Sequence, residues 1–278
     1  MGPPLEEYWQ ELIVQDDEQI DLGIGALLIA GLENPDIDFK ECLNELDLLA
    51  EDARTQLGEA SKEQYRVSDL ARFLAQDCGF TGNTDDYYDP QNSCLDAIFE
   101  GQRGIPISLS VLFIEVARRL GIEMVGTAFP GHFFIRHKTI PDLFVDTFHD
   151  GRVMTYDEVR GFFHRTLSTK LPSTEAEIPP TSKRSILARM LQNLKSIYQA
   201  KAKPIKTISV IDKLLLLDPD QPREYLVRAI NYLGISAHAF AIQDLQTYVD
   251  ISPQDSEYRA MIVEQIKDIK KKNAAVLH

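Results

Sequence analysis

RGIPISLSVLFIEVARRLG, residues 103–121, is the stretch of sequence on which the fold depends. After a Gly-Ile-Pro turn it is nearly all apolar, and a helix that is apolar on most of its sides normally lies buried at the centre of a protein. Pro106 suits the first helical turn, because the N–H that proline lacks would have no partner there. Gly121 is a typical residue at which a helix ends. We therefore expect a central buried helix from about Pro106 to Gly121.

Three short runs of β-forming residues follow the helix, with turn residues between them. The next turn, HDGRV at 149–153, is compatible with a fourth strand, and residues 155–165 again have a helical pattern. A buried helix followed by an antiparallel meander is an α+β arrangement, in which the helix packs on the sheet. The three runs are Met124–Phe129, His132–His137 and Leu143–Thr147.

The chain before the central helix is predicted to be mainly helical. Apolar residues recur at helical spacing over 21–34, where Asn-Pro-Asp ends the pattern, and again over 39–57 and 68–78. A loop rich in Gly, Asn, Asp and Tyr follows, and it leads into a short helix over 92–99. Together with the sheet, these elements make a first domain over 1–165.

The C-terminal part is predicted to be a separate helical domain. Residues 166–183 are rich in Ser, Thr and Pro and lack apolar periodicity, which is typical of a linker. Beyond them, Leu-Asp-Pro-Asp and Ile-Ser-Pro-Gln stand in equivalent positions, with 34 residues from Pro219 to Pro253. This is the period of the tetratricopeptide repeat, whose unit is a pair of antiparallel helices. We therefore assign 184–278 to tetratricopeptide-like helical repeats.

Composition narrows the classes of function. A net charge of −14 argues against nucleic acid as a partner, because binding phosphates needs a cationic surface. No run of about eighteen apolar residues occurs, so the sequence predicts no membrane span, and no secretory signal is expected either. The three cysteines include no CxxC pair, which favours a reducing cytoplasm and predicts no zinc site. We expect a cytoplasmic protein with no metal and no cofactor.

A histidine and an aspartate are the strongest candidates for a functional site. His132 stands at the start of the second predicted strand and Asp146 near the end of the third. In antiparallel neighbours, a residue early in one strand lies beside a residue late in the next. Such an aspartate orients an imidazole and stabilises its cationic form, as acid–base catalysis requires. A purely structural link between two strands is the alternative.

The nucleophile that such a pair would serve is missing from its expected place. A catalytic cysteine belongs at a helix N-terminus, where the helix dipole lowers the thiol pKa and backbone N–H groups bind the oxyanion. The central helix begins instead with Pro106, which has no nucleophilic atom. Cys94 lies a helix earlier and is expected to pack as a small apolar residue. Ser108 is close to the helix start, and a capping role is its alternative.

Two further residues are candidates for binding. Arg103, just before the Gly-Ile-Pro turn, is expected either to pair with acidic residues of the loop DDYYDP (85–90) or to bind a ligand. Tyr88 lies in the same loop as Tyr87. The two rings are expected either to wall a groove or to cover the core.

Several motifs, in their order along the chain, resemble the SirB-type transglutaminase-like/tetratricopeptide proteins, and the resemblance covers nearly the whole chain. It implies a papain-like transglutaminase core followed by tetratricopeptide helices. In the transglutaminase-like pattern the histidine corresponds to His132 and the aspartate to Asp146, while the cysteine position falls on Pro106 or very near it. The motifs are GFTGNTDDYYDPQNS (79–93), RGIPISLSVLFIEVARRLG (103–121), PGHFFIR (130–136) and FVDTF (144–148).

These features favour a cytosolic interaction or adaptor protein, which binds a protein or peptide partner through its C-terminal helical repeats. Its transglutaminase-like domain would then be a binding site without the cysteine nucleophile. The alternative is a hydrolase or acyl transferase, of a protease or transglutaminase-like kind, with Ser108 as nucleophile, His132 as base and Asp146 as the orienting residue. That alternative requires a hydrogen bond between Ser108 and His132.

Overall fold

The structure is a computed structural model, and it describes residues 5–57, 62–167, 171–253 and 257–276. The chain forms two compact units, Met1–Met190 and Leu191–His278. The first unit is α+β, as the sequence predicts. Its helices are α1 (Leu5–Ile13), α2 (Leu22–Ala30), α3 (Phe39–Gln56), α4 (Glu63–Arg72), α5 (Leu95–Gly101), α6 (Pro106–Arg119), α7 (Tyr156–Leu167) and the first part of α8 (Lys183–Ala200).

The predicted central helix is α6. All of its residues from Pro106 to Ala117 are buried, as the apolar pattern requires. Proline occupies the first helical position, and the helix ends two residues before Gly121, which takes a φ of +71°. A residue without a Cβ reaches this conformation at little cost, so the helix stops where the sequence predicts.

The predicted meander is an antiparallel sheet with strand order β3-β4-β5-β6. Phe129 pairs with His132 across the turn between the first two strands, and Gly131 in that turn has a φ of +71°. The expected fourth strand is present, while the third is shorter than predicted. The strands are β3 (Met124–Phe129), β4 (His132–His137), β5 (Phe144–Asp146) and β6 (Arg152–Met154), and a separate parallel pair joins β1 (Thr81–Gly82) to β2 (Arg103–Gly104).

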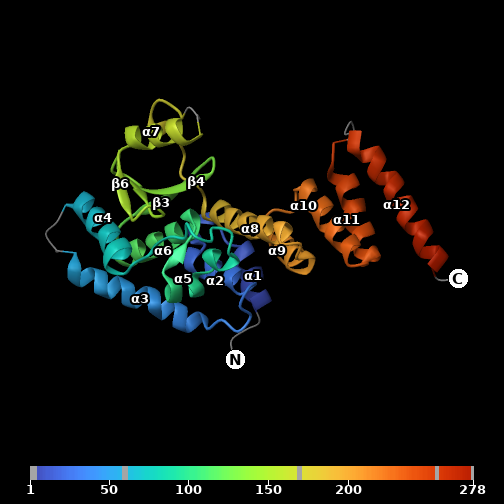
Figure 1. The fold of residues 1–278 in the computed structure, drawn as a ribbon, viewed down its shortest axis with the longest axis horizontal. Coiled ribbons are helices and arrows are strands. Elements are labelled where there is room, and N and C mark those ends of the chain that lie inside the picture. The colour runs from blue at the N-terminus through green and yellow to red at the C-terminus, as the bar shows by residue number, and fades with distance from the viewer. Residues whose placement is uncertain (1–4, 58–61, 168–170, 254–256, 277–278) are drawn as a thin grey trace. The chain divides into compact units, whose positions relative to one another are not determined.

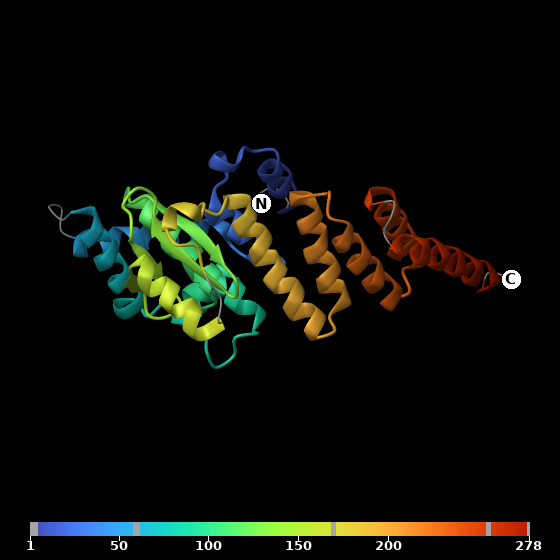
Figure 2. The ribbon, with the colours of Figure 1, turned by 90° about the horizontal axis from the view of Figure 1, so that it is seen from above.

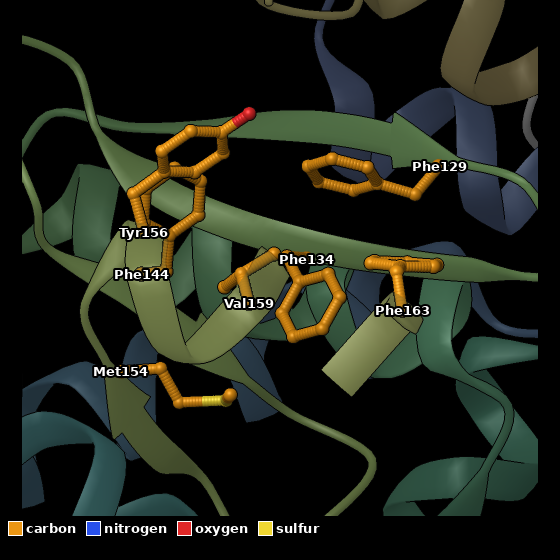
Figure 3. Close-up of a cluster of buried hydrophobic side chains, with 7 residues drawn as sticks. All are labelled: Phe129, Phe134, Phe144, Met154, Tyr156, Val159 and Phe163. Carbon is orange, nitrogen blue, oxygen red and sulfur yellow. The ribbon is translucent and has the colours of Figure 1, made fainter. Parts of the chain in front are cut away.

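Helices cover both faces of the sheet, with α6 on one side and α7 on the other (Figure 1). Alternation along the strands sends Ile135 and Val145 toward Phe113 of α6. On the other face, side chains of the strands and of α7 form one buried aromatic cluster, which Figure 3 shows. Its members are Phe129, Phe134, Phe144, Met154, Tyr156, Val159 and Phe163.

The helices before α6 follow the predicted order, with two differences. The helix expected over 68–78 begins five residues earlier, at Glu63, and its last turn, Phe73–Asp77, is a π-helix. The short helix expected from 92 is preceded by a 3₁₀ turn, Pro90–Ser93, and begins at Leu95. Helix boundaries shift in this way because tertiary packing, rather than local propensity, sets the ends of most helices.

The residues just before α8 lie against the sheet, within the segment 166–183 that composition predicts to be a linker. Thr181 donates its N–H to the carbonyl of Gly126, and its hydroxyl accepts the N–H of Ala128. These two bonds satisfy backbone groups at the outer edge of β3. The last strand of a sheet otherwise leaves such groups unpaired. The division between the compact units falls later, inside α8 after Met190.

The second unit contains the helical repeat that the spacing of the two prolines predicts. It comprises the end of α8 with α9 (Pro204–Leu217), α10 (Pro222–Gly234), α11 (His238–Ile251) and α12 (Glu257–Val276). Figure 2 shows these helices following one another along the unit. Apolar side chains of α10, α11 and α12 form a common core that includes Ala229, Ala241 and Leu245. None of the described helices is long and apolar enough to cross a lipid bilayer.

Candidate functional site

A cavity of about 430 Å³ opens at the start of α6, beside the first residue of β4. Both the helix start and the strand start contribute to its wall, through Pro106 and His132. Aromatic rings make up much of the remaining surface, which gives the cavity an apolar character with a few polar groups. The other lining residues are Thr84, Tyr87, Gly131, Phe148, His149 and Phe162.

His132 and Asp146 come together as the strand arrangement predicts. Both are buried, and His132 Nε2 lies 3.1 Å from Asp146 Oδ1. They lie on the face of the sheet that α7 covers, where the His132 ring contacts Phe134 edge-on and Phe162 at a tilt. The aromatic contacts and the carboxylate together fix the orientation of the imidazole.

A second imidazole shares the same carboxylate. His149 Nδ1 lies 2.8 Å from Asp146 Oδ2, and the His149 ring is stacked on that of His132 at 5.6 Å. Burial by itself raises the pKa of Asp146, but the hydrogen bonds from both histidines outweigh it and hold that pKa far below its usual range. The hydrogen bond between His149 and Asp146 raises the pKa of His149, while partial burial opposes the change. Asp146 is therefore an ionised acceptor, and both imidazoles donate to it.

Hydrogen bonds tie the end of β5 to the start of α6. The hydroxyl of Thr147, next to Asp146, donates to the carbonyl of Pro106 at 3.3 Å. The same hydroxyl lies 3.1 Å from that of Ser110 in the first turns of the helix. These bonds set the distance between the helix start and the His–Asp pair, which is the arrangement that a nucleophile on the helix would need.

Ser108 has other partners than His132. Its hydroxyl accepts the N–H of Ile105 at 3.1 Å, as the capping interpretation predicts, and lies 2.5 Å from the carbonyl of Asn92, to which it donates. Among the described residues, the hydrogen-bond partners of Ser108 are Asn92 and Ile105, and His132 is not one of them. Ser108 is fully buried and is not part of the cavity lining.

The two binding candidates lie outside the cavity wall. Arg103 pairs with β1 and donates to the carbonyl of Gly82 at 3.4 Å, a backbone partner in place of the expected acidic side chains of the loop. Tyr88 is 69% exposed, and its ring meets that of Tyr87 edge-on. Tyr87 is the residue that walls the cavity, where it packs against Phe148.

Arg189 of α8 is a residue at the site that sequence reasoning did not single out. Its guanidinium donates to the carbonyls of Phe129 and His132, at 3.0 and 2.8 Å, and lies over the ring of Phe133. It thus binds both ends of the β3–β4 turn, at Phe129 and His132. Nothing in the local sequence marks it, because 57 residues separate the two partners.

His149 is the second residue that the sequence analysis passed over. Its spacing of three residues from Asp146 is a usable signal, because a turn after a strand folds the fourth residue back over the first. The backbone N–H of His149 also donates to Asp146 Oδ1, at 3.3 Å. The aspartate therefore organises both its own turn and the two imidazoles.

The arrangement can bind a ligand and exchange a proton with it. Since Asp146 only accepts, it fixes the tautomer in which His132 carries a proton on Nε2, and the neutral ring leaves Nδ1 as an acceptor. A group in the cavity can donate a hydrogen bond to such an imidazole. Covalent catalysis additionally needs a nucleophile near the imidazole, and the residue at the helix start, Pro106, offers none.

Comparisons with known proteins agree with this architecture. A model of the transglutaminase-like superfamily matches residues 40–192, more than half of the chain. A tetratricopeptide-repeat model matches residues 194–267. A buried helix whose start faces a histidine and an aspartate on a sheet is thus the core of a transglutaminase-like protein, and helical repeats follow it.

Relatives of similar length occur across bacteria. A UPF0162 protein of Xylella fastidiosa is 36% identical over 249 residues, which are 88% of this chain and 89% of that protein. A UPF0162 protein of Vibrio cholerae is 25% identical and covers 87% of this chain and 90% of its own length. Protein SirB1 of Salmonella typhimurium is 21% identical, with 91% and 94% covered. The chain belongs to this transglutaminase-like family, which confirms the SirB-type resemblance.

Proposed function

We propose that this protein is a non-catalytic, cytosolic interaction protein. Its transglutaminase-like domain binds a ligand in the cavity beside His132, and its tetratricopeptide segment binds a protein or peptide partner. The single observation that carries the proposal is the position of Pro106, which stands in the cavity wall with His132 where a nucleophile would have to be. A proline there can shape a binding surface but cannot form an acyl intermediate.

The hydrogen bonds of Ser108 support the same conclusion. Its hydroxyl is engaged with Asn92 and Ile105, and both bonds would have to break before it turned toward the cavity. Breaking buried hydrogen bonds costs about 1 kcal/mol or more each, so a serine nucleophile would have to be uncovered by a rearrangement of the helix start.

The surface of the second unit supports partner binding. Phe240 is 58% exposed, and its ring stacks on that of Tyr232, while Ile230 on the preceding helix is also exposed. Aromatic side chains that are rigid and half-exposed are the kind of residue that carries binding energy at protein interfaces. Tetratricopeptide helices form extended surfaces of this type for peptides and proteins.

Catalysis is tested with purified wild type and the variant His132→Ala. Amine incorporation into a glutamine peptide and hydrolysis of an activated ester are measured for both, and we expect the two rates to be equal to background. Turnover by wild type that His132→Ala abolishes would contradict the proposal. A Pro106→Cys variant provides a matched control, because it places a thiol in the cavity wall. Alkylation of this thiol shows that the position is accessible.

Partner binding is tested by cross-linking and affinity capture from the source cells. The baits are wild type, Phe240→Ser in the second unit, His132→Ala, and Val14→Ser as an exposed control in the first unit. We expect a partner that Phe240→Ser loses and the other two variants keep. A protein that accumulates only on His132→Ala would be a trapped substrate, and the enzymatic alternative would replace the proposal.

A further inference from the structure

Three potential metal ligands meet at the wall of the cavity. His132, Asp146 and His149 each offer one ligand atom, and these atoms lie within 4.8 Å of one another. They come from the start of β4, the end of β5 and the turn after it. A spacing of 14 residues followed by 3 is not a metal motif that a sequence scan detects, and the sequence accordingly predicts no metal.

We propose that His132, Asp146 and His149 bind one divalent first-row transition-metal ion, of which Zn²⁺ is the type. Two imidazole nitrogens and one carboxylate oxygen are ligands that such ions prefer, whereas Mg²⁺ and Ca²⁺ prefer oxygen alone. Both nitrogens point at the carboxylate, so an ion placed among the three atoms replaces the two hydrogen bonds. Each imidazole would bind the ion through the nitrogen that faces Asp146 and carry its proton on the other ring nitrogen.

The separations are close to those of a metal centre. Ligand atoms at about 2.0–2.2 Å from one ion lie about 3.3–3.5 Å from each other in a tetrahedral site. His132 Nε2 lies 3.1 Å from Asp146 Oδ1 and His149 Nδ1 lies 2.8 Å from Asp146 Oδ2, and one ligand atom from each residue lies within 4.8 Å of the other two. His132 and Asp146 are buried and fixed, while the His149 side chain is 51% exposed and can turn to complete the site.

The surroundings favour a cation with an open coordination position. No lysine or arginine is among the described residues that line the cavity, so no positive side chain competes for the place. Asp146 supplies one negative charge in a buried position, and a divalent cation neutralises it. Three protein ligands leave a fourth position, and the cavity beside His132 and His149 has room for water or a ligand group there.

The metal would bind at the cavity in which the proposed function places a ligand, but it requires neither a protein partner nor the second unit, so failure of metal binding would leave the proposed partner binding untouched. It is tested with full-length, untagged protein that has been stripped with a chelator and dialysed. Equilibrium dialysis against Zn²⁺ with elemental analysis measures stoichiometry and affinity, and Co²⁺ substitution reports the ligand geometry by its visible absorption. We expect one ion per chain and the intense bands of a four-coordinate cobalt site.

Two variants locate the ion. His149→Ala removes an exposed side chain and is not expected to unfold the protein, and it should weaken binding by at least the roughly 10- to 100-fold that loss of an outer-shell partner costs. His164→Ala, in the exposed part of α7, is the matched control and should bind as wild type does. A wild type that binds no stoichiometric ion, or binding that His149→Ala leaves unchanged, would overturn the proposal.

Discussion

The two units of the molecule use buried charge in different ways. In the first unit, Asp146 gathers two histidines that both line a cavity. In the second unit, buried charges lie between packed helices. Lys195 of α8 pairs with Glu224 of α10 at 2.6 Å, and Arg228 of α10 joins Asp212 of α9 to Asp244 of α11, both at 2.7 Å.

The charges of the first unit belong to a candidate binding site, whereas those of the second unit hold helices together. Arg228 links neighbouring helices of a repeat, and each of its partners lies 16 residues away in the chain. Such a bridge holds the register of successive helices, and its charged atoms are paired with one another. The carboxylate of Asp146 also has its hydrogen bonds, but one of its partners is an exposed imidazole at a cavity, which can exchange its partner for a ligand or an ion.

The largest effect on stability is expected for Asp146→Ala. The change removes the acceptor of two imidazoles and of the N–H groups of Phe148 and His149, in a buried position. We expect the free energy of unfolding of the first unit to fall by about 3 kcal/mol, measured by urea denaturation. Asp146→Asn keeps an acceptor for the backbone and should lose less. Equal losses for both variants would mean that the backbone bonds of Asp146 contribute nothing and that the whole loss comes from its charge.

A smaller loss is expected for Arg228→Met in the second unit. The variant leaves Asp244, which is buried, without its cation, and we expect a loss of about 2 kcal/mol that is confined to α10 and α11. Hydrogen exchange localises the loss to these helices. The double variant Arg228→Met, Asp244→Leu should recover most of it, because the buried carboxylate of Asp244 is gone and Asp212, the other partner of Arg228, is 42% exposed. A double variant that is no more stable than Arg228→Met would show that the loss does not come from the unpaired Asp244.

The smallest effect is expected for Glu158→Gln. This substitution removes an exposed ion pair with Arg152 that lies neither at the cavity nor between packed helices. The N–H of Thr155 and the guanidinium of Arg152 hold the pKa of Glu158 below its ordinary value. A lowered carboxyl pKa stabilises the fold above the ordinary pKa, and this stabilisation disappears as the pH falls through the lowered one.

Wild type should therefore melt about 1 °C above Glu158→Gln at pH 7, and the difference should disappear as the pH falls below the ordinary glutamate pKa and through the lowered pKa of Glu158. Thermal unfolding followed by circular dichroism at several pH values measures it. A gap that persists at pH 3 would assign the effect to helix capping by the neutral side chain.

Most elements of the fold could be predicted from local sequence patterns. The apolar run from Pro106, the turn at Gly131 and the 34-residue spacing between Pro219 and Pro253 each carry a local signal, and the structure contains the corresponding helix, hairpin and repeat. The contact of Thr181 with β3 carries no such signal, because composition does not distinguish Thr181 from the rest of the Ser-, Thr- and Pro-rich segment around it.

The sequence by itself determined the α+β core, the helical repeats and the meeting of His132 with Asp146, since periodicity and strand order are properties of neighbouring residues. The tertiary structure alone decided what surrounds that pair. It placed Pro106 in the same cavity wall and directed the hydroxyl of Ser108 to Asn92. It also brought His149 to the second carboxylate oxygen of Asp146, and Arg189 of α8 to the turn before His132. These contacts depend on side-chain direction and on long-range packing, neither of which a local pattern encodes.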